Sequence, residues 1–93
     1  MTQLTLRKIS KPNCRPCAVL TNYLESIAVD LLALDVNVAE HDIADDPALV
    51  ERYNLSSVPV LVLERNGYEV GRLNGLVSTT EILDAVKAAK EDV

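Results

Sequence analysis

The segment Cys14-Arg15-Pro16-Cys17 contains both cysteines of the 93-residue chain. It lies between an apolar, β-prone run at residues 3–10, which predicts a strand, and an apolar helical repeat at residues 18–31. Pro16 suits a first helical turn, because its missing N–H is not needed there. Two cysteines so spaced at a strand-to-helix corner can close a disulfide within one turn. The first sulfur then lies at a helix N-terminus, where unpaired N–H groups favour a thiolate.

The helical repeat after this segment has one apolar face, which predicts different surroundings for the two sulfurs. Its members are Cys17, Leu20, Leu24, Ile27 and Leu31. Since Cys17 belongs to this face, we expect it to be the more buried and the slower to alkylate. Cys14, near Lys11 and Arg15, is predicted to be the nucleophile, and Cys17 the resolving thiol. The alternative is a pair of ordinary buried cysteines.

The remaining elements follow from periodicity and turn residues. They are a strand at 36–42, a short helix at 46–53, strands at 60–63 and 69–73, and a last helix after a capping box at Ser78–Glu81. Asn66-Gly67 predicts a hairpin, and the unbroken apolar run 60–63 predicts a strand buried on both faces. A right-handed crossover makes the first two strands parallel. We predict an α/β fold, β-α-β-α-β-β-α, with a four-stranded mixed sheet of order 2-1-3-4 and helices on both faces.

Composition narrows the class of protein. The chain is 48% hydrophobic but has no Trp, no Phe and three Tyr, so we expect an aliphatic core. A net charge of -5 argues against nucleic acid as a partner. No apolar run approaches the ~18 residues of a membrane span, and the N-terminus lacks the pattern of a signal peptide. We therefore expect a cytoplasmic protein that does not bind membranes. We also expect a monomer without a cofactor.

Several motifs together resemble the thioredoxin superfamily, and thioredoxin more than glutaredoxin. Cys14-Arg15-Pro16-Cys17 is similar to the family's Cys-Gly-Pro-Cys, and Val58-Pro59 to the approach to its cis-proline. Asn66-Gly67 and Gly75 resemble its hairpin and the glycine that follows. The resemblance covers nearly the whole chain and implies a single thioredoxin-like domain over residues 1–93. The chain lacks the N-terminal strand and helix of full thioredoxins, and Asn13 stands where an aromatic residue is usual.

The resemblance implies a substrate groove around the two thiols. Its expected members are Asn13, Arg15, Pro16, Val58, Pro59, Asn74 and Gly75. A cis Val58-Pro59 bond, packed close to the sulfurs, would leave the backbone of Val58 free to pair with an extended substrate strand. The alternatives are a trans proline that begins a strand and, at Gly75, a simple turn.

One mismatch with the family predicts a charged pair. Thioredoxins carry a buried aspartate six residues before the first cysteine and a lysine on the neighbouring strand, whereas the matching positions here hold Lys8 and Glu40. Period-two spacing puts both on the core face. Because an unpaired buried charge is costly, we predict that Lys8 and Glu40 approach each other beneath Cys17 and take part in catalysis. Glu40 would then be the candidate proton acceptor for Cys17. The alternative is that both side chains reach solvent.

The predicted function is a thiol-disulfide oxidoreductase that reduces protein disulfides. The resemblance implies recharging by a flavin-dependent thioredoxin reductase, with ribonucleotide reductase as a possible client. A glutathione-dependent glutaredoxin is the close alternative. A metal-binding module is the competing class, but two cysteines supply half of a tetrahedral zinc site. The single histidine, His41, is expected to be a packed or surface residue across the sheet.

Overall fold

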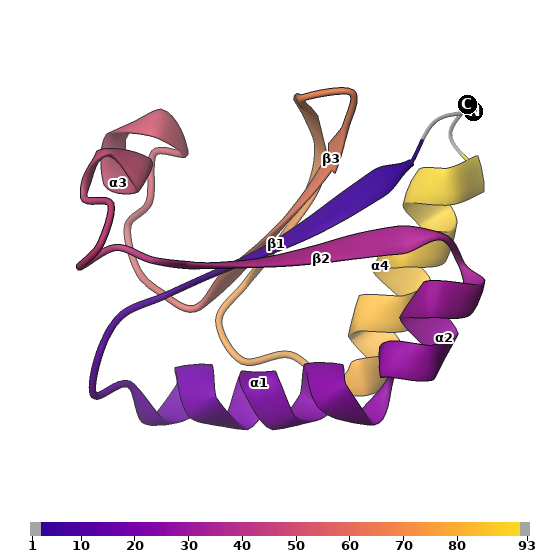
Figure 1. The fold of residues 1–93 in the computed structure, drawn as a ribbon, viewed down its shortest axis with the longest axis horizontal. Helices are drawn as coiled ribbons and strands as arrows, with labels where there is room; N and C mark the ends of the chain where they lie inside the picture. The colour runs from indigo at the N-terminus through magenta and orange to yellow at the C-terminus, as the bar shows by residue number, and fades with distance from the viewer. Residues whose placement is uncertain (1–2, 92–93) are drawn as a thin grey trace.

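A computed structural model describes residues 3–91 of the chain (Figure 1). Its elements are β1 Leu4–Ser10, α1 Arg15–Ser26, α2 Ala28–Ala33, β2 Val36–Asp42, α3 Ala48–Arg52, β3 Val60–Arg65, β4 Tyr68–Asn74 and α4 Thr79–Glu91. The strands form a four-stranded sheet of order β2-β1-β3-β4, as predicted. β1 pairs parallel with β2 and antiparallel with β3, and β3 pairs antiparallel with β4. β2 and β4 are therefore the edges of a mixed sheet.

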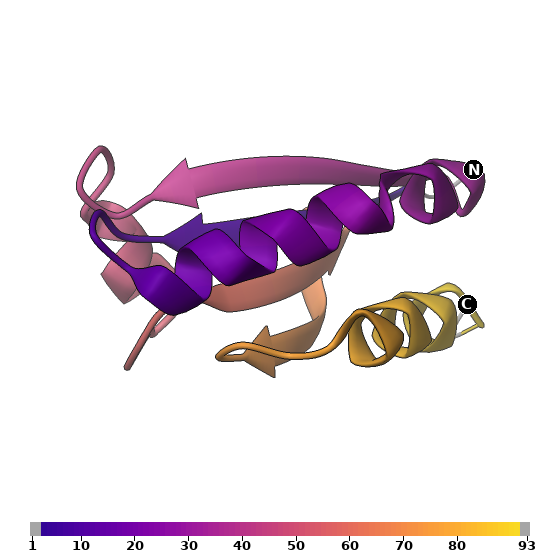
Figure 2. The same cartoon turned by 90° about the horizontal axis from the view of Figure 1, so that it is seen from below.

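Helices cover both faces of the sheet (Figures 1 and 2). On one face, Leu4 and Leu6 of β1 pack with residues of α1, α2 and α4 in the larger core cluster. On the other face, Ile9 packs with Leu49 of α3 and Tyr53 in a smaller cluster. Successive side chains of a strand point to opposite faces, so β1 contributes to both clusters. The aliphatic core predicted from composition is thus divided into two layers.

The third and fourth strands form the predicted hairpin and are longer than predicted. Asn66 and Gly67 both have positive φ, 53° and 83°, which is the backbone that a tight hairpin turn requires. β3 extends through Arg65, and its Leu61 and Val62 are fully buried on opposite faces. The hairpin therefore completes the sheet with a strand that is buried on both sides.

The single helix predicted at residues 18–31 is wrong, because the chain breaks at Ile27 into α1 and α2. Ile27 leaves helical geometry, with φ −111° and ψ 16°. The Ser26 hydroxyl donates to the Tyr23 carbonyl at 2.6 Å, and such a bond competes with the backbone ladder at the end of a helix. Ile27 and Leu31 still face the core, so the apolar repeat continues across the break.

The last helix begins with the predicted capping box. Ser78 Oγ accepts from the Glu81 amide at 3.1 Å, and Glu81 Oε1 accepts from the Ser78 amide at 3.4 Å. This satisfies N–H groups at the helix start and places Ile82 and Val86 against the sheet. None of the helices within residues 3–91 is long and apolar enough to cross a bilayer.

Candidate active site

Cys14 begins α1 and serves as its N-cap. Its backbone is extended, with φ −114° and ψ 106°, and its sulfur accepts the Cys17 amide at 3.3 Å. The two cysteines form a disulfide with their Cα atoms 5.3 Å apart. The preceding residue, Asn13, has φ 56°, a left-handed conformation that asparagine tolerates and that turns the chain from β1 into α1. The Cys14 sulfur therefore lies at the helix N-terminus, where backbone N–H groups favour a thiolate.

The two sulfurs differ in exposure, as predicted. Cys17 is 4% exposed and is one of the buried residues of α1, with Leu20 and Leu24. Cys14 is half-buried and precedes the exposed Arg15 and Pro16. Cys14 is thus the more accessible of the two cysteines, and Cys17 is shielded by the protein.

The disulfide lies in an open depression of about 620 Å³ that is positively charged. Both cysteines line it, together with Lys8, Lys11 and Arg15, and no carboxylate is among its lining residues. The chain as a whole carries a net charge of -5, so this concentration of cations is local. Opposite charge nearby favours a thiolate.

The residues predicted to form the groove are brought together in part. The Val58-Pro59 peptide bond is cis, as predicted, and the Pro59 carbonyl accepts the Gly75 amide at 2.8 Å. Asn74, at the end of β4, pairs with Val60, which follows Pro59. Val58 lines a separate pocket of about 210 Å³ that shares Lys11 with the disulfide depression. Asn13 and Arg15 line the depression itself.

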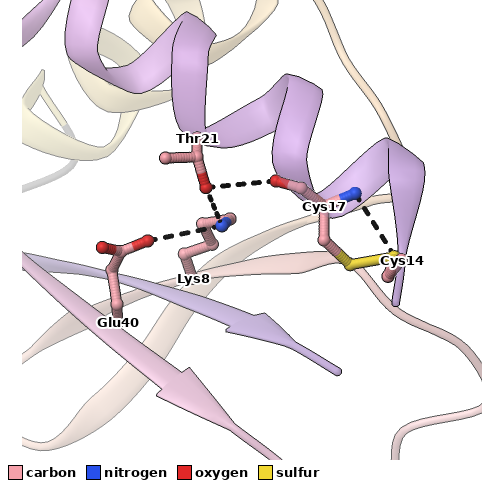
Figure 3. A network of polar contacts seen from close by, with 5 residues as sticks. All are labelled: Lys8, Cys14, Cys17, Thr21 and Glu40. Carbon is pink, nitrogen blue, oxygen red and sulfur yellow. Dashed lines mark hydrogen bonds and ion pairs between the residues drawn. A yellow bond between two sulfur atoms is a disulfide. The ribbon is translucent and has the colours of Figure 1, made fainter. Parts of the chain in front are cut away.

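Lys8 and Glu40 approach each other, as predicted, but they are buried to very different extents (Figure 3). They are directly paired across β1 and β2, and Lys8 Nζ lies 3.3 Å from Glu40 Oε1. Lys8 is 4% exposed and lines the disulfide depression. The Glu40 side chain is 61% exposed and does not line this depression. It lines a neighbouring pocket between α1 and β2, which shares Thr21 with the depression. The expectation that both charges lie buried beneath Cys17 is wrong for Glu40, because β2 is an edge strand and leaves its carboxylate in solvent.

Two hydroxyls complete the surroundings of Cys17, and sequence reasoning missed both. Lys8 Nζ donates to Thr21 Oγ1, and Thr21 Oγ1 donates to the Cys17 carbonyl at 3.1 Å. Ser10 Oγ is buried beside the same depression and has no hydrogen-bond partner within residues 3–91. Both positions could have been inferred from sequence spacing. Thr21 follows Cys17 by one helical turn, and Ser10 follows Lys8 on the same strand face.

A second polar network lies on the opposite face of the sheet. Arg7 Nε donates to Glu64 Oε1 at 2.5 Å and Tyr53 OH donates to Glu64 Oε2 at 2.8 Å. Burial raises the pKa of Glu64, but the hydrogen bonds from Arg7 and Tyr53 outweigh burial and leave that pKa below its ordinary value. Burial, with the bond to Glu64, raises the pKa of Tyr53. His41 Nε2 lies 2.9 Å from Arg7 Nη1, in this network.

No three His, Cys, Asp or Glu side chains within residues 3–91 are grouped to hold a metal ion. His41 faces the same side of the sheet as Ile9, its partner in the β1–β2 register. Lys8, which lines the disulfide depression, faces the other side. The histidine is thus held in the Arg7 network, across the sheet from the cysteines.

Comparison with known proteins agrees with this geometry. The thioredoxin family model matches residues 2–88. The chain belongs to the thioredoxin family. Among curated thioredoxins, that of Chlamydia caviae is 41% identical over 63 residues, which are 68% of this chain and 60% of that protein. The SPbeta prophage-derived thioredoxin-like protein YosR of Bacillus subtilis is 33% identical over 73 residues, covering 77% of this chain and 82% of YosR.

Solved thioredoxin structures share the fold. A mutant thioredoxin of Halobacterium salinarum superimposes with a TM-score of 0.83 at 28% identity, covering 94% of this chain and 74% of that one. A structure of thioredoxin-2 from the malaria parasite has a TM-score of 0.83 at 14% identity, covering 94% and 84%. The thioredoxin core thus accounts for nearly all of this chain, while the match spans 60% of the length of the Chlamydia caviae thioredoxin.

Proposed function

We propose that this thioredoxin-family chain is a thiol-disulfide oxidoreductase that reduces disulfides in other proteins. The observation that carries the proposal is the Cys14–Cys17 disulfide at the start of α1, with one sulfur accessible and the other buried. In the dithiol form, the Cys14 thiolate attacks one sulfur of a client disulfide, and the other client sulfur leaves as a thiolate and takes up a proton. Cys17, after losing its proton, attacks Cys14 Sγ. This closes the Cys14–Cys17 bond and releases the second client thiolate, so two electrons pass to the client.

The oxidised protein must then be recharged by an external reductant. We propose a flavin-dependent thioredoxin reductase in this role and a monomer that acts in the cytoplasm, with ribonucleotide reductase as one possible client. The match to the thioredoxin model over residues 2–88 supports this choice over the glutaredoxin alternative. Recharging assays with purified thioredoxin reductase and NADPH, or with glutathione and glutathione reductase, separate the two routes. Faster recharging by glutathione would favour the glutaredoxin alternative.

The main test is to trap clients covalently. Cys17→Ser removes the resolving sulfur, so mixed disulfides through Cys14 should accumulate and be released by dithiothreitol. Cys14→Ser is the matched control, which keeps an oxygen at the helix cap and should trap little, because its remaining cysteine, Cys17, is 4% exposed. Equal trapping by both variants, or none by either, would contradict the proposal.

A further inference from the structure

Lys8 is a buried charged residue that lines the same depression as the disulfide. It and Glu64 are the buried charged residues of the described chain, each 4% exposed. Glu64 is held by Arg7 and Tyr53 on the α3 face. Lys8 instead lines the depression that contains Cys14 and Cys17. Burying a charge is costly, and this charge is buried beside the reacting sulfurs.

The contacts of Lys8 fix its ammonium without neutralising it fully. Its Nζ donates to Thr21 Oγ1, on the face of α1 that also carries Cys17. Its carboxylate partner, Glu40 Oε1, lies 3.3 Å away on a side chain that is 61% exposed. Water screens an exposed charge strongly. In Figure 3 the ammonium lies between Glu40 and the disulfide, with the carboxylate on the far side.

The other groups that surround Cys17 add positive charge or none. Lys11 and Arg15 line the same depression. The β3 residue paired with Lys8 is Leu61, and α4 packs on this face through buried apolar residues. Glu25 of α1 lines the neighbouring pocket with Glu40, not the disulfide depression. The local field at Cys17 therefore favours negative charge on sulfur.

We propose that the Lys8 ammonium stabilises the Cys17 thiolate during the second step of disulfide exchange, with Glu40 as its solvated counterion. The proposal rests on the proposed function for its relevance to catalysis. Cys17 gives its proton to water in the open depression, and Lys8 keeps its own proton throughout. The sulfur electron pair then forms the bond to Cys14 Sγ, and the pair of the broken bond leaves on the client thiolate. Neither Lys8 nor Glu40 accepts the proton in this step.

The interaction of Lys8 with the thiolate should also affect the redox equilibrium between the dithiol and the disulfide forms of the protein. A cation beside the thiols stabilises the reduced form wherever that form contains a thiolate, and it has no such partner in the disulfide. Removing the cation should therefore favour the disulfide and make the protein a stronger reductant. The thiolate also becomes scarcer, so resolution of the mixed disulfide should be slower at neutral pH.

The first experiment measures Cys17 alone, in the Cys14→Ser background, by the pH dependence of iodoacetamide alkylation. We expect Lys8→Met to lower the rate near neutral pH about tenfold and to move the profile upward by about one pH unit. Lys8→Arg, which keeps the charge, should restore most of the rate. Glu40→Gln should leave the rate unchanged or raise it, because it removes only the counterion. A slower Glu40→Gln would instead support Glu40 as proton acceptor and overturn the proposal, as would an unchanged Lys8→Met.

Two controls separate charge from structure. Thr21→Val removes the hydroxyl that holds Lys8 but leaves the charge, so its profile should stay close to that of the parent. Lys11→Met removes an exposed cation of the same depression. Its effect should disappear in high salt, whereas the Lys8 effect should persist, because buried charges are screened much less. Loss of the Lys8 effect in high salt would contradict a buried interaction.

The second experiment uses the protein with both cysteines and measures its redox equilibrium with glutathione. Lys8→Met should shift the equilibrium about tenfold toward the disulfide, which corresponds to about 30 mV. If Lys8→Met does not fold, Lys8→Gln tests the same loss of charge. No client or reductase is present in either experiment, so they test Lys8 even if client trapping fails. Conversely, trapping by Cys17→Ser tests the proposed function whatever Lys8 does.

Discussion

Arg7 and Lys8 are neighbours on β1, yet their side chains enter two different polar networks on opposite faces of the sheet. On the α3 face, the acid is the buried partner, since the Glu64 side chain is 5% exposed and that of Arg7 is 28% exposed. On the α1 face the cation is the buried partner, with values of 5% for Lys8 and 61% for Glu40. Each pair thus joins a cation on β1 to a glutamate, and the two pairs differ in which partner is buried.

This difference indicates different roles for the two networks. The Glu64 network stabilises the fold, whereas the Lys8 network can act on the two sulfurs. Both carboxylate oxygens of Glu64 accept hydrogen bonds from protein groups, so its charge is compensated where it lies. The charge of Lys8 is compensated by a carboxylate in solvent, and its surroundings include the two sulfurs. A buried charge is expected to act on whichever polar groups share its low-dielectric surroundings.

The largest expected effect is on the α3 face. Glu64→Ala leaves Arg7 without its carboxylate and the buried Tyr53 hydroxyl without its acceptor. We expect a loss of about 2–3 kcal/mol in the free energy of unfolding, measured by urea denaturation. The matched control is Glu69→Ala, which removes a carboxylate bonded to Arg72 at the exposed surface and should cost less than about 1 kcal/mol. Equal losses in the two variants would remove the distinction between buried and exposed pairs.

The second effect is the pH dependence of the same network. The pKa of Glu64 is lowered in the folded protein, so its stabilisation is present above the unfolded value of about 4.3 and is lost as the pH falls through the folded value. The stability difference between wild type and Glu64→Gln should therefore shrink as the pH is lowered in this range. Urea denaturation at a series of acidic pH values measures it. A difference that stays constant down to the lowest pH would contradict the assignment.

A smaller effect is expected for the tyrosine of this network. Tyr53→Phe removes one hydrogen bond to Glu64 and keeps the ring in the smaller core cluster. We expect a loss of about 1 kcal/mol, with no change in the rate of Cys17 alkylation. An altered alkylation rate would show that the two faces are coupled through the sheet.

The smallest effect is expected for the pair on the α1 face. A double-mutant cycle of Lys8→Met and Glu40→Gln should give a coupling of less than about 1 kcal/mol in unfolding, because Glu40 is largely solvated. Lys8→Met should nevertheless move the alkylation profile of Cys17 upward in pH. A large coupling in stability without any change in that profile would assign Lys8 a purely structural role.

Much of this arrangement could be predicted because it follows from local periodicity. Cys17 lies on an apolar helical face, so its burial followed from spacing alone. The approach of Lys8 and Glu40 was implied by the resemblance, because these positions match a charged pair of thioredoxins, and the two residues are directly paired across β1 and β2. Their unequal burial did not follow, because it depends on how far the helices extend over the edge strand. That coverage is a property of packing between distant segments.

The features that sequence reasoning missed depend on element ends and on long-range contacts. The third strand was predicted to end at Leu63, which left Glu64 outside the sheet. With the strand extended to Arg65, period two places Glu64 on the same face as Val62 and, through the register with β1, on the face of Arg7. The break at Ile27 was missed because the apolar repeat continues through it.

The Cys14 sulfur, which we propose as the nucleophile, is also the cap of α1, since it accepts the Cys17 amide at 3.3 Å. The environment of the Cys17 backbone N–H therefore depends on the chemical state of the Cys14 sulfur. Its NMR chemical shift and its hydrogen-exchange rate would report, without any added label, whether the sulfur is a thiolate, a disulfide or part of an adduct. Serine at position 14 retains a capping acceptor, whereas alanine does not. A variant that removes the Cys14 thiol therefore also weakens the first turn of α1, unless the new side chain can accept the Cys17 N–H.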